Sequence, residues 1–152
     1  MTFHVERWAP FYVDALPIME RHYAEIGLNQ DRVKFSLDAA RYQAMDNSGM
    51  LHVLAARIEG KLVGYYIAFV MPHIHYQHSG LMAFTDIYYI VPEARRGGAG
   101  LRLFIEAEDG LRARGVVKAY ISTKLHKDNT MLFEKLGWTA TDKAFTKMLG
   151  AA

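Results

Sequence analysis

A run of basic and glycine residues stands between a β-like segment and a helix-like segment: Arg95, Arg96, Gly97, Gly98, Ala99 and Gly100. Glycine lets the backbone adopt positive φ and approach a ligand closely. Successive N–H groups that open onto a helix N-terminus form a cradle for an anion, and arginine suits a pyrophosphate. Two interpretations stay open, a phosphate-binding loop and an ordinary basic loop. A Walker A site is excluded because no Gly-Lys-Ser/Thr follows.

Asp86 is the one charged residue in an otherwise largely apolar run over residues 81–91. Strand alternation would place Phe84, Asp86, Tyr88 and Ile90 on one face. Desolvation there would raise the pKa of a carboxyl group toward the range in which it can accept a proton near neutral pH. The sequence predicts Asp86 as a general base. The alternative is a carboxylate that accepts hydrogen bonds from a bulge or a neighbouring loop.

Three histidines, His73, His75 and His78, lie in the loop before that strand. These three histidines give little support to a zinc site, because no fourth ligand is evident. Two further interpretations remain, solvated loop side chains and the lining of a substrate pocket. In a pocket, His75 could relay a proton near neutral pH.

His22 stands four residues from both Ile18 and Ile26, so it faces the apolar side of a helix. This position predicts a core-edge histidine that is satisfied by a hydrogen bond. Glu25, three residues further on, could pair with His22 or with a cationic substrate.

The elements that position these residues follow the order βααβββαβαββ, which indicates an α/β or α+β domain over residues 1–152 without an internal boundary. Strands are expected at 3–8, 51–58, 62–70, 81–91 and 116–122, with a final hairpin at 138–141 and 144–149. Helices are expected at 14–27, 36–47, 101–115 and 128–136. Glu59-Gly60 predicts a hairpin turn. Gly110 lies inside the third helix, where it costs about 1 kcal/mol relative to alanine.

Composition restricts the class of protein. The chain has 152 residues, of which 51% are hydrophobic and 22% charged, as in globular proteins. The absence of cysteine excludes disulfides, thiolate metal sites and a cysteine nucleophile. The net charge of +2 gives little support to nucleic-acid binding. The basic residues that could serve it are Arg95, Arg96, Arg102, Arg112, Arg114, Lys118 and Lys124.

The N-terminus resembles no secretory signal and no run of about 18 apolar residues occurs, so a cytoplasmic protein without a membrane partner is expected.

Residues 91–104, VPEARRGGAGLRLF, resemble the acetyl-CoA-binding segment of the GNAT family of N-acetyltransferases. The family pattern, Arg/Gln-x-x-Gly-x-Gly/Ala, is matched by Arg95, Gly98 and Gly100. Residues 133–138, FEKLGW, resemble the family's later Tyr-Glu-Lys-x-Gly-Phe segment, and the order of elements matches over essentially the whole chain. The sequence around His75, Tyr76 and Asp86 also resembles acetyltransferases carried by bacteriophages and prophages.

The resemblance implies a mixed, mostly antiparallel sheet flanked by helices, with the pantetheine arm of acetyl-CoA lying between two splayed strands. Ile90 and Val91 would contact this arm through their backbone, and one N–H would face the thioester carbonyl. Residues 95–100 would hold the pyrophosphate, and His126 and Asn129 would lie near the cofactor. The wall of the acceptor site would include His22, Glu25 and Tyr88, with Asp86 and His75 as the catalytic residues.

The implied activity is transfer of an acetyl group to a primary amine of a small molecule or a protein by direct attack, with no metal. A homodimer is compatible with the family. Phe133 departs from the pattern, because the family has a tyrosine there that often protonates the leaving thiolate, and phenylalanine carries no such proton. Phe133 therefore favours an alternative, a non-catalytic acyl-CoA-binding or interaction module, whereas Asp86 favours the enzyme.

Overall fold

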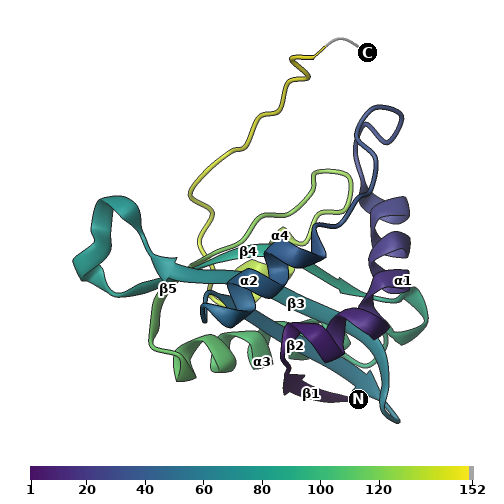
Figure 1. The fold of residues 1–152 in the computed structure, drawn as a ribbon, viewed down its shortest axis with the longest axis horizontal. Coiled ribbons are helices and arrows are strands. Elements are labelled where there is room, and N and C mark those ends of the chain that lie inside the picture. The colour runs from purple at the N-terminus through teal and green to yellow at the C-terminus, as the bar shows by residue number, and fades with distance from the viewer. Residues whose placement is uncertain (151–152) are drawn as a thin grey trace.

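The computed structural model describes residues 1–150 and places a five-stranded sheet between two layers of helices (Figure 1). Strands β1 (Thr2–Val5), β2 (Leu51–Ile58), β3 (Lys61–Pro72) and β4 (Leu81–Ile90) are antiparallel neighbours. Strand β5 (Val116–Tyr120) is parallel to β4. This confirms the predicted mixed, mostly antiparallel sheet.

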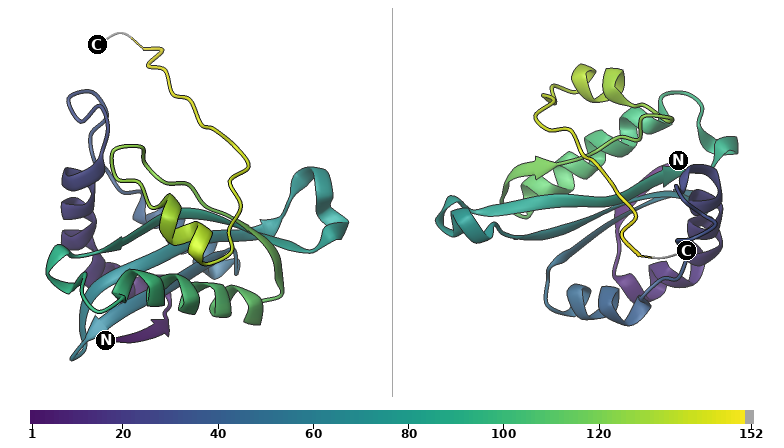
Figure 2. Two further views of the ribbon diagram at one scale, coloured as in Figure 1. Left: turned by 180° about the vertical axis from the view of Figure 1, so that it is seen from behind. Right: turned by 90° about the horizontal axis from the view of Figure 1, so that it is seen from above.

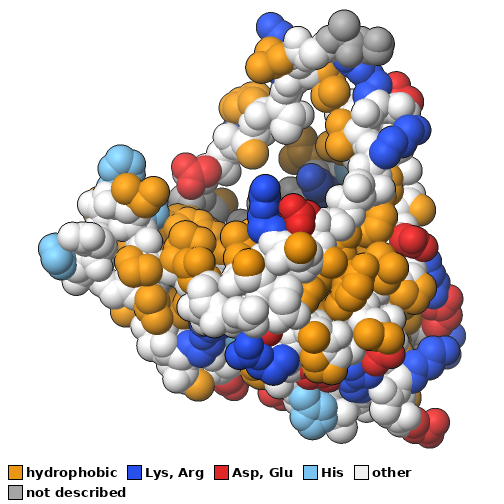
Figure 3. All heavy atoms as spheres, viewed as in Figure 1, with side chains coloured by type: hydrophobic (Ala, Val, Ile, Leu, Met, Phe, Trp, Pro, Cys, Tyr) orange, Lys and Arg blue, Asp and Glu red, His pale blue; other side chains and the backbone are white. Residues whose placement is uncertain are grey.

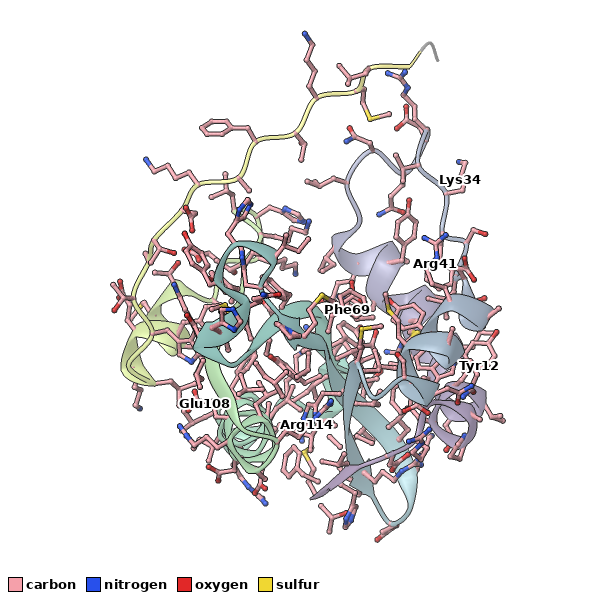
Figure 4. All side chains as sticks on the ribbon, turned by 60° about the vertical axis from the view of Figure 1, so that its left-hand side comes forward. Tyr12, Lys34, Arg41, Phe69, Glu108 and Arg114 are labelled. Atoms are coloured by element: carbon pink, nitrogen blue, oxygen red, sulfur yellow. The ribbon has the colours of Figure 1, made fainter. Side chains whose placement is uncertain are left out.

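Two pairs of helices cover opposite faces of the sheet (Figure 2). Helices α1 (Trp8–Ile26) and α2 (Ala39–Asn47) lie on one face, and α3 (Ala99–Ala113) and α4 (Thr130–Lys135) lie on the other. Two short 3-10 helices, η1 (Ile74–Ser79) and η2 (Pro92–Ala94), flank β4 along the chain. Figure 4 labels Tyr12 on α1 and Glu108 on α3.

The apolar spacing predicted the buried sides of α1 and α3 but not that of α2, whose one buried residue is Asp46. Helix α1 buries Phe11, Ile18 and His22, which recur at intervals of seven and four residues. The predicted hairpin turn is also confirmed, because Glu59 and Gly60 both have positive φ, 50° and 80°. Positive φ at both central positions is typical of two-residue hairpin turns.

Helix α1 begins at Trp8, six residues before the start that was predicted at residue 14. The N–H of Trp8 donates to the carboxylate of Asp46 at 3.1 Å, and the guanidinium of Arg7 pairs with the same oxygen at 3.0 Å. Because Asp46 belongs to α2, a residue distant in the sequence caps this helix. Helix α2 begins after Asp38, whose carboxylate accepts from the N–H of Arg41, and not at Ser36.

The final hairpin predicted at 138–141 and 144–149 does not form. Within residues 1–150 the chain after α4 contains no strand, and β5 ends the sheet. Figure 1 shows this segment leading away from the body toward the loop after α1. Its apolar side chains, such as Phe145, are exposed. Alternation predicts a strand only where a neighbouring strand accepts its backbone groups, and here none does.

His52 explains the glycine inside α3. Its ring is buried on β2, and a Cβ atom at Gly110 would lie 2.8 Å from His52 Cε1 and 3.0 Å from Nε2. Neither ring nitrogen has a hydrogen-bond partner among the described residues. Burial lowers the pKa of His52 from 6.5 to about 4. Protonation therefore favours the unfolded chain, and His52 lowers the stability as the pH falls from 6.5 through 4.

Gly110→Ala is expected to lower the free energy of unfolding by about 1–3 kcal/mol, because the added methyl group overlaps a buried ring. The helix-propensity gain of about 1 kcal/mol offsets part of the steric cost, so the net loss lies toward the lower end of this range. His52→Val removes the ring, so Gly110→Ala should cost less in that background. Urea denaturation of the four proteins of this double-mutant cycle measures the coupling. Equal costs of Gly110→Ala in both backgrounds would contradict the explanation.

Candidate active site

Strands β4 and β5 separate part-way along their length. They pair from Leu81 to Phe84 of β4 and from Val116 to Tyr120 of β5, and not beyond. A pocket of about 580 Å³ opens where they diverge. Its walls come from β4 residues 86–90, the C-terminal part of α1, the first half of α3 and residues 122–132.

A β-bulge interrupts β4 at the pocket. Ile67 of β3 pairs with Ile87, but the next residue, Ala68, pairs with Thr85, so Asp86 has no partner across the ladder. The extra residue changes the alternation of side chains between the two faces of the sheet.

The prediction that Phe84, Asp86, Tyr88 and Ile90 share one face is therefore wrong. Asp86 accepts a hydrogen bond from Tyr42 of α2. The ring of Tyr88 instead packs against Phe104 of α3, on the opposite side of the sheet. The two side chains reach the same pocket from its two sides.

Asp86 combines accessibility with a perturbed carboxyl group. The residue is exposed at the pocket, yet neighbouring groups partly enclose its carboxylate and raise its pKa above the ordinary value. The hydrogen bond from Tyr42 offsets part of this rise. Tyr42 was not predicted as a site residue, and no sequence signal pairs it with a carboxylate 44 positions away.

The backbone of β4 presents a free N–H to the pocket at Ile90 but not at Val91. The N–H of Val91 donates to Val63 of β3 at 2.8 Å. Because successive N–H groups in a strand point to opposite edges, those of Tyr88 and Ile90 point toward the gap. The predicted role of the Val91 amide is therefore corrected, while the Ile90 amide remains available to a ligand.

The glycine loop has the conformation that an anion cradle needs. Gly97 and Gly98 have positive φ, 59° and 76°, and Gly98 precedes the first turn of α3, which contains no acidic residue. Gly98, Ala99 and Gly100 line the pocket. A Cβ atom at Gly100 would meet only Leu132, at 3.9 Å. Free N–H groups at the start of a helix of this length fit a phosphate.

The two arginines of the loop differ in what they contact. Arg95 lines the pocket, but its guanidinium donates to both oxygens of Glu25 at 2.8 Å and to the carbonyl of Ile90 at 2.7 Å. It therefore links α1 to the end of β4 and does not extend toward the glycines. Arg96 is exposed, and neither it nor Gly97 lines the pocket.

His22 and Glu25 form the α1 side of the pocket, which brings together two predicted acceptor-site residues. His22 Nδ1 lies 2.8 Å from the hydroxyl of Tyr65, and its ring stacks on Tyr89. Burial lowers the pKa of His22 from 6.5 to about 4, so the ring is neutral at pH 7. Hydrogen bonds from Arg95 and Tyr89 hold the pKa of Glu25 at about 2, so it is ionised.

Two further predicted site residues, His75 and His126, also lie outside the pocket. His75 is exposed in η1, at the other end of β4, where its ring neighbours those of His73 and Tyr76. Figure 3 shows exposed histidines on the loop that contains η1. The structure therefore removes His75 from the Asp86 site. His126 is exposed and does not line the pocket either, whereas Asn129 does.

A metal site and a nucleic-acid surface gain no support from the described residues. Within residues 1–150 no group of three His, Asp or Glu side chains is placed to hold a metal ion. Several of the basic residues are engaged locally: Arg112 pairs with Glu108 and Asp109, and Arg114 donates to the carbonyls of Leu51 and Gly49. Within residues 1–150, none of the helices has the length and hydrophobicity that a membrane span requires.

The model of the acetyltransferase (GNAT) family matches residues 8–138. The chain belongs to this family. The match covers every element that builds the pocket, from α1 to α4.

Aminoglycoside N(6')-acetyltransferase type 1 of Klebsiella aerogenes is 33% identical over 73 residues. This alignment spans 48% of each chain, about half the length of the relative.

Solved structures share the fold at low identity. An aminoglycoside acetyltransferase, meta-AAC0020, from an uncultured soil metagenomic sample has a TM-score of 0.72 at 15% identity and covers 99% of this chain and 95% of its own. The ribosomal-protein-alanine N-acetyltransferase of Brucella melitensis biovar Abortus 2308 has a TM-score of 0.69 at 18% identity, with 98% and 100% covered. A predicted acetyltransferase from Clostridium acetobutylicum, solved with acetyl-CoA, has a TM-score of 0.71 at 11% identity, with 97% and 95% covered.

Proposed function

We propose that this chain transfers the acetyl group of acetyl-CoA to a primary amine of a small molecule by direct attack of the amine on the thioester. One observation carries the proposal: a single pocket joins an anion cradle at the start of α3 to a carboxylate with a raised pKa, Asp86. The cradle suits the pyrophosphate of acetyl-CoA, and the carboxylate suits proton removal from an amine.

The pocket residues divide the recognition of acetyl-CoA between them. The amides around Gly98, Ala99 and Gly100 hold the pyrophosphate, and Arg96 contributes positive charge from the exposed loop. The free N–H groups of Tyr88 and Ile90 line the path of the pantetheine arm in the gap between β4 and β5. Arg95 acts here as a brace between Glu25 and the end of β4.

Asp86 accepts the proton that the attacking amine loses. The nitrogen lone pair forms the new bond to the thioester carbon, and negative charge develops on the carbonyl oxygen. An N–H at the open edge of β4 stabilises this charge, because it is fixed before the reaction begins. The bulge at Asp86 places the carboxylate beside that edge.

The proposed acceptor is a small-molecule amine. Two proteins similar to this chain are named aminoglycoside acetyltransferases, which supports aminoglycosides as the first compounds to test. The carboxylate of Asp86 lies in the pocket and would attract a cationic amine, whereas the carboxylate of Glu25 is already paired with Arg95 and Lys127. Protein N-termini are the competing acceptors, and the resemblance to phage-encoded members stays a prediction.

The function is tested with the wild-type chain, acetyl-CoA and three acceptors: an aminoglycoside, a polyamine and a peptide with a free N-terminus. Calorimetry is expected to show acetyl-CoA binding, and an amine acceptor is expected to cause release of free thiol and to gain one acetyl group. Binding without thiol release from any acceptor would favour the non-catalytic module that Phe133 suggests. A chain that does not bind acetyl-CoA would contradict both functions.

A further inference from the structure

The leaving thiolate of CoA needs a proton donor, and Phe133 cannot be that donor. When the carbon–sulfur bond breaks, negative charge develops on sulfur, and a positioned proton donor lowers the barrier to this step. Phe133 is buried between Phe104 and Trp138 and carries no donor group. The inference that follows rests on the proposed function.

Tyr88 places a phenol hydroxyl in the gap between β4 and the chain that follows β5. Its ring is fixed by edge-to-face contacts with Phe104 and Phe133, at centroid distances of 5.1 and 6.0 Å. Its hydroxyl donates to the carbonyl of Ser122 at 3.0 Å and accepts from Asn129 Nδ2 at 3.4 Å. The phenol thus spans the opening of the gap, and Tyr88, Ser122 and Asn129 all line the pocket.

We propose that the hydroxyl of Tyr88 donates the proton that the leaving thiolate of CoA takes up. The hydroxyl can rotate away from the Ser122 carbonyl toward a sulfur in the gap. The amide of Asn129 donates to the same phenol oxygen and stabilises the phenolate that remains. Burial raises the pKa of Tyr88, and the Asn129 hydrogen bond offsets part of the rise, so the hydroxyl keeps its proton at neutral pH.

The proton and electron balance of the step is complete. The amine nitrogen forms a bond to the acetyl carbon, its proton passes to Asp86, and the electrons of the carbon–sulfur bond move to sulfur. Sulfur takes the proton of Tyr88, and free CoA leaves as the thiol. The phenolate then regains a proton from water, and Asp86 releases its proton to solvent.

The other donors in the pocket wall have different engagements. The hydroxyl of Tyr89 donates to Glu25 at 2.7 Å, and Lys127 pairs with the same carboxylate at 3.7 Å. His22 is neutral, and its Nδ1 is paired with Tyr65. Ser122 and Lys124 also line the pocket and carry donor groups, and Lys124 is the competitor that the test includes.

The test compares Tyr88→Phe with the wild-type chain, Tyr120→Phe and Lys124→Met. Tyr120 lies outside this pocket on β5, so Tyr120→Phe controls for the loss of a phenol hydroxyl elsewhere. Tyr88→Phe is expected to lower kcat about tenfold or more. Its KM for acetyl-CoA, its affinity for CoA and its melting temperature should stay near the wild-type values. The solvent deuterium isotope effect on kcat should also decrease.

A wild-type kcat in Tyr88→Phe would overturn the proposal, as would a large loss of kcat in Lys124→Met with Tyr88→Phe unaffected. A joint change of kcat, KM and melting temperature in Tyr88→Phe would also overturn it, because that pattern indicates a structural role. If the wild-type chain releases no thiol with any acceptor, the proposed function fails first. If the wild-type chain turns over and Tyr88→Phe does so equally, only the assignment of Tyr88 fails.

Discussion

Asp86→Asn is expected to lower kcat by about 10²–10⁴-fold, the usual contribution of a general base. The amide keeps the shape of the side chain and can still accept a hydrogen bond from Tyr42, but it cannot take the proton of the amine. Acetyl-CoA affinity should stay near the wild-type value, because the glycine loop lies at the other end of the pocket. Steady-state kinetics and calorimetry measure the two quantities.

The pH dependence of the reaction separates this role from a structural one. The base must be ionised, so kcat falls as the pH drops through the pKa of Asp86, which partial burial raises above its ordinary value. Asp86→Asn should remove this acidic limb. Tyr42→Phe keeps the carboxylate but removes the hydrogen bond that lowers its pKa, so the limb should move to higher pH. Normal turnover in Asp86→Asn, with binding and melting unchanged, would exclude Asp86 from the mechanism.

Gly100→Val is expected to weaken acetyl-CoA binding about a hundredfold, or about 2.7 kcal/mol. The fold has room for the side chain, because a Cβ atom there meets only Leu132, at 3.9 Å. Since Gly100 and Leu132 both line the pocket, the added atoms occupy ligand space and separate the pyrophosphate from the helix amides. Loss of one hydrogen bond to a charged group costs about 1.5–3 kcal/mol. Gly100 is a better position for this test than Gly98, whose φ of 76° would strain any side chain.

Glu106→Val is the matched control for Gly100→Val, because it places the same side chain on α3 outside the pocket. Calorimetry with acetyl-CoA should separate the two variants, while their melting temperatures stay similar. S-acetylpantetheine lacks the pyrophosphate, so its kcat/KM should be the same in Gly100→Val and the wild-type chain. An acetyl-CoA affinity in Gly100→Val equal to that of Glu106→Val would contradict a pyrophosphate site at the start of α3.

Local patterns were sufficient to predict most of the scaffold. The alternation of residues 51–58 and the Glu59-Gly60 turn predicted the β2–β3 hairpin, because both depend on neighbours in the chain. The glycines before α3 predicted a loop with positive φ for the same reason. The start of α1 was mispredicted because its cap, Asp46, lies 38 positions away on α2. The C-terminal hairpin was mispredicted because a strand needs a partner as well as an apolar pattern.

The sequence by itself determined which residue types could do chemistry: a glycine loop before a helix, a carboxylate in an apolar strand, and a phenylalanine without a proton to donate. Only the tertiary structure decided how they act together. The bulge at Asp86 turned Tyr88 to the opposite face, and the Glu25–Arg95 pair joined residues 70 positions apart. The tertiary structure also excluded His75 from the pocket of Asp86, because η1 precedes β4 and the pocket lies at the other end of that strand. The packing of the whole sheet and its helices sets the strand register and the contacts between distant segments. Short-range sequence patterns therefore cannot predict either of them.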